Sequence, residues 1–319
     1  MLRRLLRPLL RPLALAFCLL ALTIPPAAAK PLTVLLDWFV NPDHGPLVVA
    51  QEAGYFAEAG LEVELIAPAD PNDPPKLVAA EKAEVAVTYQ PQVHMQAAAG
   101  LPLVRIATLV ATPLNSVVVL DEGPIKTLAD LKGRKIGYSV GGFEDALLGT
   151  MLASHGVKLD EVELINVNFA LSPSIVAGKV DATIGAFRNF ELNQMDINGT
   201  PGRAFYPEEH GVPAYDELVL VAHRDHLDDP RLPKLVAAIG RATRHMVNHP
   251  EESWEMFAQA YPDLNDELNR RAWADTLPRF ALRPAALDTT RYETFGAFLK
   301  EQGLIDTVPP LDTYARQID

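Results

Sequence analysis

Lys82-Ala-Glu-Val-Ala-Val87 and Lys179-Val-Asp-Ala-Thr-Ile184 follow one pattern, in which a base, a small or branched residue and an acid precede a short apolar run. Each segment follows a stretch of helical character, and each ends close to an aromatic residue, Tyr89 or Phe187. A unit that recurs within one chain indicates two similar substructures built by the same local rules. We therefore predict two related lobes.

Strand and helix patterns alternate over the rest of the chain. Period-two alternation or short apolar runs predict strands at 32–36, 61–66, 85–87, 135–139, 162–166, 182–184 and 217–222. A first helix is predicted at 44–59, and the region 233–303 is almost wholly helical in pattern. Alternation of this kind predicts an α/β fold with mostly parallel sheets.

A turn-rich break, Asp121-Glu-Gly-Pro124, separates the two repeated units. We assign 30–116 and 217–319 to the first lobe and 117–216 to the second, so the chain crosses between the lobes twice. Two lobes joined in this way form a cleft. Small ligands bind in such clefts, where the carboxyl ends of parallel strands meet.

The segment 1–29 has the order of a secretory signal peptide. A positive region (Arg3, Arg4, Arg7, Arg11) precedes the apolar run 13–24, and the small residues Ala27-Ala28-Ala29 follow it. The run is shorter than the roughly 20 apolar residues that a membrane span needs. We expect cleavage after Ala29 and export to the periplasm of a product without cysteine, since Cys18 lies within the run.

Composition excludes several classes of function. The formal net charge is −13, and loss of the four arginines takes it to −17, which makes contacts with nucleic-acid phosphates unfavourable. Neither G-x-S-x-G nor H-E-x-x-H occurs, and the histidines are scattered. We therefore expect no catalytic residues, metal or cofactor, no nucleic-acid partner, and a monomer that binds a small molecule.

Aromatic, polar and glycine residues follow the predicted strands and form the candidate ligand site: Trp38, Asn41, His44, Tyr89, Asn115, Gly141, Gly142, Phe187 and Glu191. Aromatic faces there can stack on a planar ligand, and the polar groups can bind its edge. Each residue also has a structural interpretation. The aromatics can be core residues, Asn41 and Asn115 can cap turns, and His44 can begin a helix.

Two of these segments carry sharper alternatives. Gly141 and Gly142 let backbone amides approach a ligand at the start of a helix. We expect Glu144, which follows them, to interact with the helix dipole and not with the ligand. Glu191 can accept hydrogen bonds from an aminopyrimidine. It can equally pair with Arg188 three residues earlier on a helix, an interaction that stabilises little.

Several stretches together resemble the periplasmic binding proteins for thiamine pyrimidine precursors, a group related to the yeast thiamine pyrimidine synthase. The matching stretches are Leu36-Asp-Trp-Phe-Val-Asn-Pro42, Gly45-Pro46, Gly54-Tyr-Phe56, Thr127-Leu-Ala-Asp-Leu-Lys-Gly133, Ser139-Val-Gly-Gly-Phe-Glu144 and Gly178-Lys-Val-Asp-Ala182. Binding proteins for sulfonates and nitrate share the general pattern. Asp37-Trp38 together with Phe187 and Glu191 forms its more specific part.

The resemblance implies a type II periplasmic-binding-protein fold that closes on a formylated or hydroxymethylated aminopyrimidine and delivers it to the permease of an ABC importer. It places Trp38 and Phe187 against the ring and Glu191 on its amino face. Two alternatives stay open. One is a sulfonate or other anion bound by Arg188, and the other is an enzyme that makes such a pyrimidine. The synthases depend on a histidine followed by clustered cysteines, which this sequence lacks.

Overall fold

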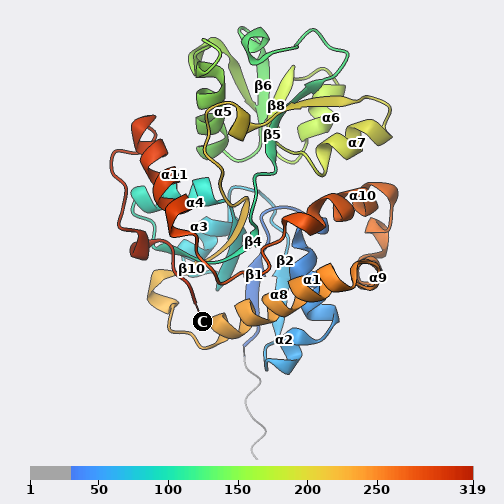
Figure 1. The fold of residues 1–319 in the computed structure, drawn as a ribbon, viewed down its shortest axis with the longest axis vertical. Helices are drawn as coiled ribbons and strands as arrows, with labels where there is room; N and C mark the ends of the chain where they lie inside the picture. Colours follow the sequence, from blue (N-terminus) through green and yellow to red (C-terminus); the bar gives the residue numbers. More distant parts are fainter. Residues whose placement is uncertain (1–29, 319) are drawn as a thin grey trace, which may run out of the picture. The chain divides into compact units, whose positions relative to one another are not determined.

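The structure, a computed structural model, describes residues 30–318 and contains two five-stranded sheets (Figure 1). The signal peptide predicted at 1–29 lies outside the described residues. Between 30 and 318, no helix is both long enough and apolar enough to cross a membrane.

The first sheet has the strand order β2-β1-β3-β10-β4. Its strands are β1 (Leu32–Leu35), β2 (Val63–Ile66), β3 (Val85–Thr88), β4 (Leu103–Val110) and β10 (Leu218–His223). β1 pairs in parallel with β2 and β3, whereas β10 runs antiparallel to both β3 and β4. Four strands therefore point one way, and only the strand that returns from the second lobe opposes them.

The second sheet repeats this plan with the order β7-β6-β8-β5-β9. Its strands are β5 (Asn115–Leu120), β6 (Lys135–Tyr138), β7 (Glu163–Asn166), β8 (Ala182–Phe187) and β9 (Gly202–Phe205). β6 pairs in parallel with β7 and β8, and β5 runs antiparallel to β8 and β9. Here too the opposing strand is the one that arrives from the other lobe.

The repeated segments of the sequence occupy equivalent places in the two sheets. β3 and β8 each take the third position, each after a short helix, α3 (Pro74–Ala79) or α6 (Leu171–Val176). Each also precedes a helix at the cleft, α4 (Gln90–Ala98) or α7 (Glu191–Ile197). The predicted α/β fold with two lobes is confirmed.

The first crossing lies slightly earlier than the predicted boundary. β5 begins at Asn115, which pairs with Phe187, and Ser116 pairs with Ala186. Asn115 and Ser116 are therefore part of the second sheet. The boundary placed after residue 116 put them in the first lobe because their side chains are polar and resemble a turn.

Helices cover both faces of each sheet (Figure 1). In the second lobe α5 (Phe143–Ala153) packs on β8 from one side, and α6 and α7 cover the other. In the first lobe α1 (Gly45–Glu52) packs against α8 (Arg231–Asn248). The remaining helices are α2 (Tyr55–Glu58), α9 (Pro250–Ala260), α10 (Glu267–Thr276) and α11 (Thr289–Glu301).

One predicted helix was wrong and three strands were not predicted. The helix expected at 44–59 is divided between α1 and α2, because Gly54 adopts a φ of 75° that ends α1. The missed strands are β4, β5 and β9; in β4, Arg105 interrupts the apolar pattern. The Arg105 side chain is wholly buried and donates hydrogen bonds to the carbonyl oxygens of Pro284 (3.0 Å) and Ala286 (2.6 Å).

Candidate functional site

A cleft of about 380 Å³, open to solvent, lies at the carboxyl ends of β1, β3, β6 and β8. Both lobes contribute to its lining, which consists of Asp37, Trp38, Asn41, Asp43, Tyr89, Glu144, Leu171, Gly185, Phe187, Phe190 and Glu191. The carboxyl ends of parallel strands are where α/β folds bind ligands. The structure thus brings Trp38, Asn41, Tyr89, Phe187 and Glu191 of the predicted site together.

Aromatic rings form the walls of the cleft. Trp38 meets Phe169 edge to face, with ring centroids 4.5 Å apart at 69°. Tyr89 stacks on Phe143 at 4.8 Å and meets Phe187 edge-on at 6.4 Å. Because Trp38 comes from the first lobe and Phe187 from the second, a planar ligand in the cleft contacts aromatic surface of both lobes.

A hydrogen-bonded group fixes the wall after β1. The Tyr89 hydroxyl donates to Asp37 Oδ2 (2.9 Å), and His44 Nε2 lies 2.9 Å from Asp37 Oδ1. The backbone amide of Asn41 donates to His44 Nδ1 (3.3 Å), which assigns the ring proton of His44 to Nε2. His44, predicted as a ligand-site residue, is completely buried and absent from the lining of the cleft. It orients Asp37 instead.

Three carboxyl groups of the lining are protonated more readily than is usual. Burial raises the pKa of Glu144 and of Glu191 to about 8, and that of Asp43 to about 6. Backbone amides oppose this shift, since Ser139 N donates to Glu144 Oε2 (2.8 Å) and Phe187 N donates to Glu191 Oε2 (2.6 Å). In the empty cleft at pH 7 both glutamates are therefore mainly neutral.

No lysine, arginine or histidine is among the described residues that line this cleft. An anionic ligand would enter a site of carboxyl groups without a counter-charge. A ligand that presents N–H donors finds acceptors at several points of the wall. The chemistry of the lining thus favours an amino-bearing planar molecule.

The glycine turn lies outside the cleft. The Gly141 amide donates to Asn72 Oδ1 (3.0 Å), and Asn72 Nδ2 donates to the Ser139 carbonyl (3.1 Å). Gly141 and Gly142 line a separate shallow depression beside Gln92. Gly141 and Gly142, predicted to face the ligand, are thus absent from the lining of the cleft, and Asn72 of the first lobe occupies their turn. Glu144, assigned to the helix dipole, lies in the first turn of α5 and also lines the cleft.

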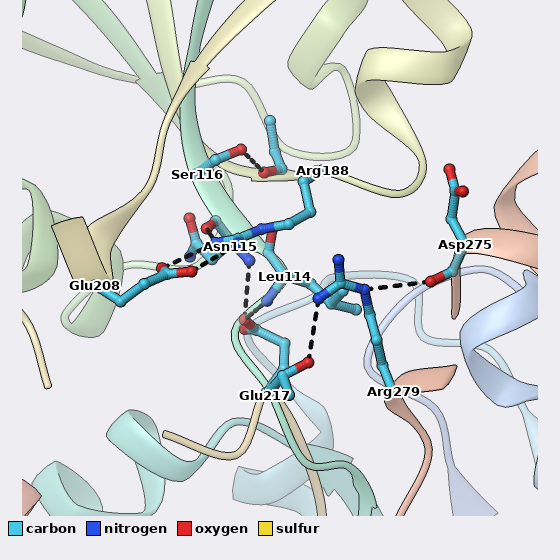
Figure 2. A network of polar contacts seen from close by, with 10 residues as sticks. Leu114, Asn115, Ser116, Arg188, Glu208, Glu217, Asp275 and Arg279 are labelled. Atoms are coloured by element: carbon cyan, nitrogen blue, oxygen red, sulfur yellow. Dashed lines mark hydrogen bonds and ion pairs between the residues drawn. The ribbon is translucent and has the colours of Figure 1, made fainter. Parts of the chain in front are cut away.

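Asn115 and Arg188 belong to the crossing between the lobes (Figure 2). Asn115 is completely buried, and its Oδ1 accepts from the Gly185 amide (3.0 Å). Arg188 binds both carboxylate oxygens of Glu208 (2.6 and 3.0 Å), and its guanidinium lies 4.0 Å above the Tyr206 ring. Asn115, predicted as a ligand-site residue, is thus absent from the lining of the cleft, and Arg188 pairs with Glu208 rather than with Glu191.

Contacts also join the lobes on the far side of the cleft. Asn189 Nδ2 of the second lobe donates to Asp43 Oδ1 (2.6 Å), and the Thr276 hydroxyl donates to the same oxygen (2.8 Å). Asp43 Oδ2 is buried and has no hydrogen-bond partner. These hydrogen bonds join the two lobes at Asp43, whose Oδ2 remains an unused acceptor.

Sequence reasoning did not select Asp37, Asp43, Glu144, Leu171, Gly185 and Phe190. Asp37 and Glu144 were detectable, since both directly follow predicted strands. Leu171 and Phe190 carry no signal, because an apolar residue at a helix start is indistinguishable from a core residue. Gly185 lies within a strand, and the reason for a glycine there is visible only in the structure, where the Glu144 carboxyl occupies the space of a side chain.

The chain matches the family model described as NMT1/THI5 like over residues 41–253. A Haemophilus influenzae protein named "Putative thiamine biosynthesis protein" is 52% identical over 301 residues, which cover 94% of this chain and 96% of the relative. The formylaminopyrimidine-binding protein of Halalkalibacterium halodurans is 35% identical over 78% of this chain and 76% of its own. A 4-amino-5-hydroxymethyl-2-methylpyrimidine phosphate synthase from Legionella pneumophila is 25% identical over 86% and 87%.

Solved structures show the same fold at low identity. The alkanesulfonate-binding protein of Xanthomonas axonopodis superposes with a TM-score of 0.69 at 16% identity, covering 89% of this chain and 96% of the other. The nitrate-binding protein of Synechocystis has a TM-score of 0.66 at 14% identity, covering 90% and 86%. The predicted type II periplasmic-binding-protein fold is thereby confirmed.

Proposed function

The chain belongs to the NMT1/THI5-like family, and we propose that it is a periplasmic solute-binding protein that holds an aminopyrimidine precursor of thiamine in its cleft. The protein delivers this ligand to the permease of an ABC importer. The fold supports the transport role, and relatives named for thiamine biosynthesis and for formylaminopyrimidine binding support the ligand class.

One observation carries the proposal, namely an aromatic cleft whose described lining contains four carboxyl groups and no lysine, arginine or histidine. The ring of an aminopyrimidine lies between Trp38 and Phe187, where it gains stacking and burial of apolar surface. Glu191 accepts a hydrogen bond from the amino group and donates its own proton to a ring nitrogen, as a neutral carboxylic acid can. Such a paired contact rejects ligands that lack the amino group.

The proposed role is binding without turnover. Synthases are among the relatives of this chain, but the clustered cysteines expected of them are absent, since Cys18 is the single cysteine. The predicted signal peptide accords with a periplasmic receptor and not with an intracellular enzyme. Incubation with pyridoxal phosphate, histidine and iron is expected to yield no pyrimidine.

An anion-binding role is disfavoured by the position of Arg188. Its guanidinium is bonded to Glu208 and donates to the Asn115 carbonyl (3.2 Å), so it pairs with a carboxylate of the protein at the crossing. A sulfonate in the cleft would face Asp37, Asp43 and the two glutamates instead.

Calorimetry separates these possibilities. We expect 4-amino-5-hydroxymethyl-2-methylpyrimidine to bind with a Kd near or below about 1 μM, which corresponds to about 8 kcal/mol, and an alkanesulfonate to give no heat. Glu191→Leu should weaken pyrimidine binding about 10-fold or more, since it removes both the acceptor for the amino group and the proton that the ring nitrogen accepts. Glu209→Leu, which alters an exposed acid, is the matched control. Heat with the sulfonate and none with the pyrimidine would contradict the proposal.

A further inference from the structure

We propose that Glu144 is a second ligand-binding carboxyl of the cleft and that it selects a pyrimidine whose side arm carries an amine. Its carboxyl fits there because residue 185 is glycine. The inference rests on the proposed function and specifies the ligand within it. It assigns to Glu144 and Gly185 a role in specificity.

Gly185 creates the space that the Glu144 carboxyl fills. A Cβ atom on residue 185 would lie 2.5 Å from Glu144 Oε1 and 2.7 Å from its Cδ, closer than real Cβ contacts come. The backbone there has a φ of 96°, which side chains rarely adopt. The Gly185 amide is also bonded to Asn115 Oδ1, so this part of β8 is held in place. Any other residue at 185 would displace the carboxyl from the cleft.

Glu144 is fixed at the cleft and does not face solvent as a helix cap usually does. It lies in the first turn of α5, is only 3% exposed, and accepts from the Ser139 amide. Burying a carboxyl in this way is unfavourable unless the group is paired. A ligand that pairs with it recovers that free energy, so the arrangement points to a bound partner.

Both glutamates lie against the end of β8. The Glu144 carboxyl lies beside Gly185, and Glu191 Oε2 accepts from the Phe187 amide two residues further along the strand. A strand advances about 3.3 Å per residue, so these two positions are about 7 Å apart. A ring that places its amino face on Glu191 therefore has a substituent within reach of Glu144.

Charge determines which donor fits best at Glu144. Its pKa of about 8 means that it is mainly neutral when the cleft is empty at pH 7. A hydroxyl or formamide arm leaves it neutral, whereas an ammonium arm replaces its proton and forms a charge-assisted hydrogen bond, roughly twice as strong as a neutral one. A carboxylate arm would be repelled. No base in the described lining competes for the ionised Glu144.

Calorimetry with ligands that share the 4-amino-2-methylpyrimidine ring tests this. The 5-aminomethyl compound should bind about 10-fold tighter than the 5-hydroxymethyl and 5-formamidomethyl compounds, and the 5-carboxylate should bind weakest. In two buffers of different ionisation heat at pH 7, the amine alone should release about one proton. Glu144→Gln, which keeps an acceptor for the Ser139 amide, should abolish both the preference and the proton release. Glu209→Gln, at an exposed acid of the same lobe, should retain both.

The outcomes distinguish the two proposals. If the Glu144→Gln variant still binds the 5-hydroxymethyl compound, the variant is folded and its cleft is intact. If the wild type does not prefer the amine, or if Glu144→Gln keeps the preference and the proton release, the inference is overturned while the proposed function stands. If the wild type binds none of the pyrimidines, the proposed function falls and the inference falls with it.

Discussion

The stability of the ligand-free protein should fall as pH rises through the range in which Glu144 and Glu191 ionise. Both carboxyls have a pKa of about 8 in the folded chain against an ordinary 4.5. Below 4.5 they are protonated in both folded and unfolded states. Between 4.5 and 8 the unfolded chain loses these protons and the folded chain keeps them, so each rise in pH favours unfolding.

The magnitude follows from the size of the shift. At 1.36 kcal/mol per pH unit, a rise from 4.5 to about 8 corresponds to at most about 5 kcal/mol for each group. Opening of the lobes hydrates the ionised carboxyls and limits the penalty, so we expect each glutamate to account for about 1–3 kcal/mol between pH 5 and pH 9.

Urea unfolding at constant ionic strength across this range measures the effect, with the m-value as the check that unfolding remains two-state. Glu191→Gln should be less stable than wild type, or equal to it, at pH 5 and should gain on it steadily toward pH 9. Glu209→Gln, the exposed control, should run parallel to wild type. Parallel profiles for Glu191→Gln and wild type would refute the reasoning, because they would mean that Glu191 is hydrated in the folded protein.

Three further predictions concern single side chains. Trp38→Ala should weaken pyrimidine binding about 10-fold through loss of stacking, as measured by calorimetry, and unchanged affinity would remove Trp38 from the site. Arg188→Met should lower the unfolding free energy by about 1–3 kcal/mol, since it removes the hydrogen bonds to the carbonyl groups of the buried residues Leu114 and Asn115. Pyrimidine affinity should stay within a few-fold, and loss of binding in a folded variant would mean that Arg188 contacts the ligand. Gly185→Ala should cost about 1–3 kcal/mol in backbone strain and remove the amine preference, and a variant that binds the amine as wild type does would show that Glu144 acts elsewhere.

Much of the fold was predictable because its signals are local. The repeat at β3 and β8 reflects two strands that are buried in equivalent positions, and period-two patterns are properties of a few consecutive residues. β4 escaped prediction because the partners of Arg105 are carbonyl groups near residues 284–286, far away in the chain. A buried charge looks like a surface residue until those partners are known.

The candidate site was predictable only in part. Trp38, Tyr89 and Phe187 follow strands whose carboxyl ends meet, so topology brings them to the cleft. His44 lies beside these residues in the sequence, yet it is buried behind Asp37. Asn115 likewise holds the Gly185 amide at the crossing. Whether such a side chain faces the ligand or supports another residue depends on its neighbours in space.

The sequence by itself determined the α/β fold, the two lobes and the aromatic residues at the strand ends, because each follows from patterns within a short stretch of chain. Tertiary structure alone decided the chemistry of the cleft. Glu144 and Glu191 are both acids at the start of a helix after a strand, a context that usually implies a solvated cap. Their raised pKa values and their contacts arise from desolvation by residues distant in the sequence. Packing brings those residues close, and no local pattern encodes it.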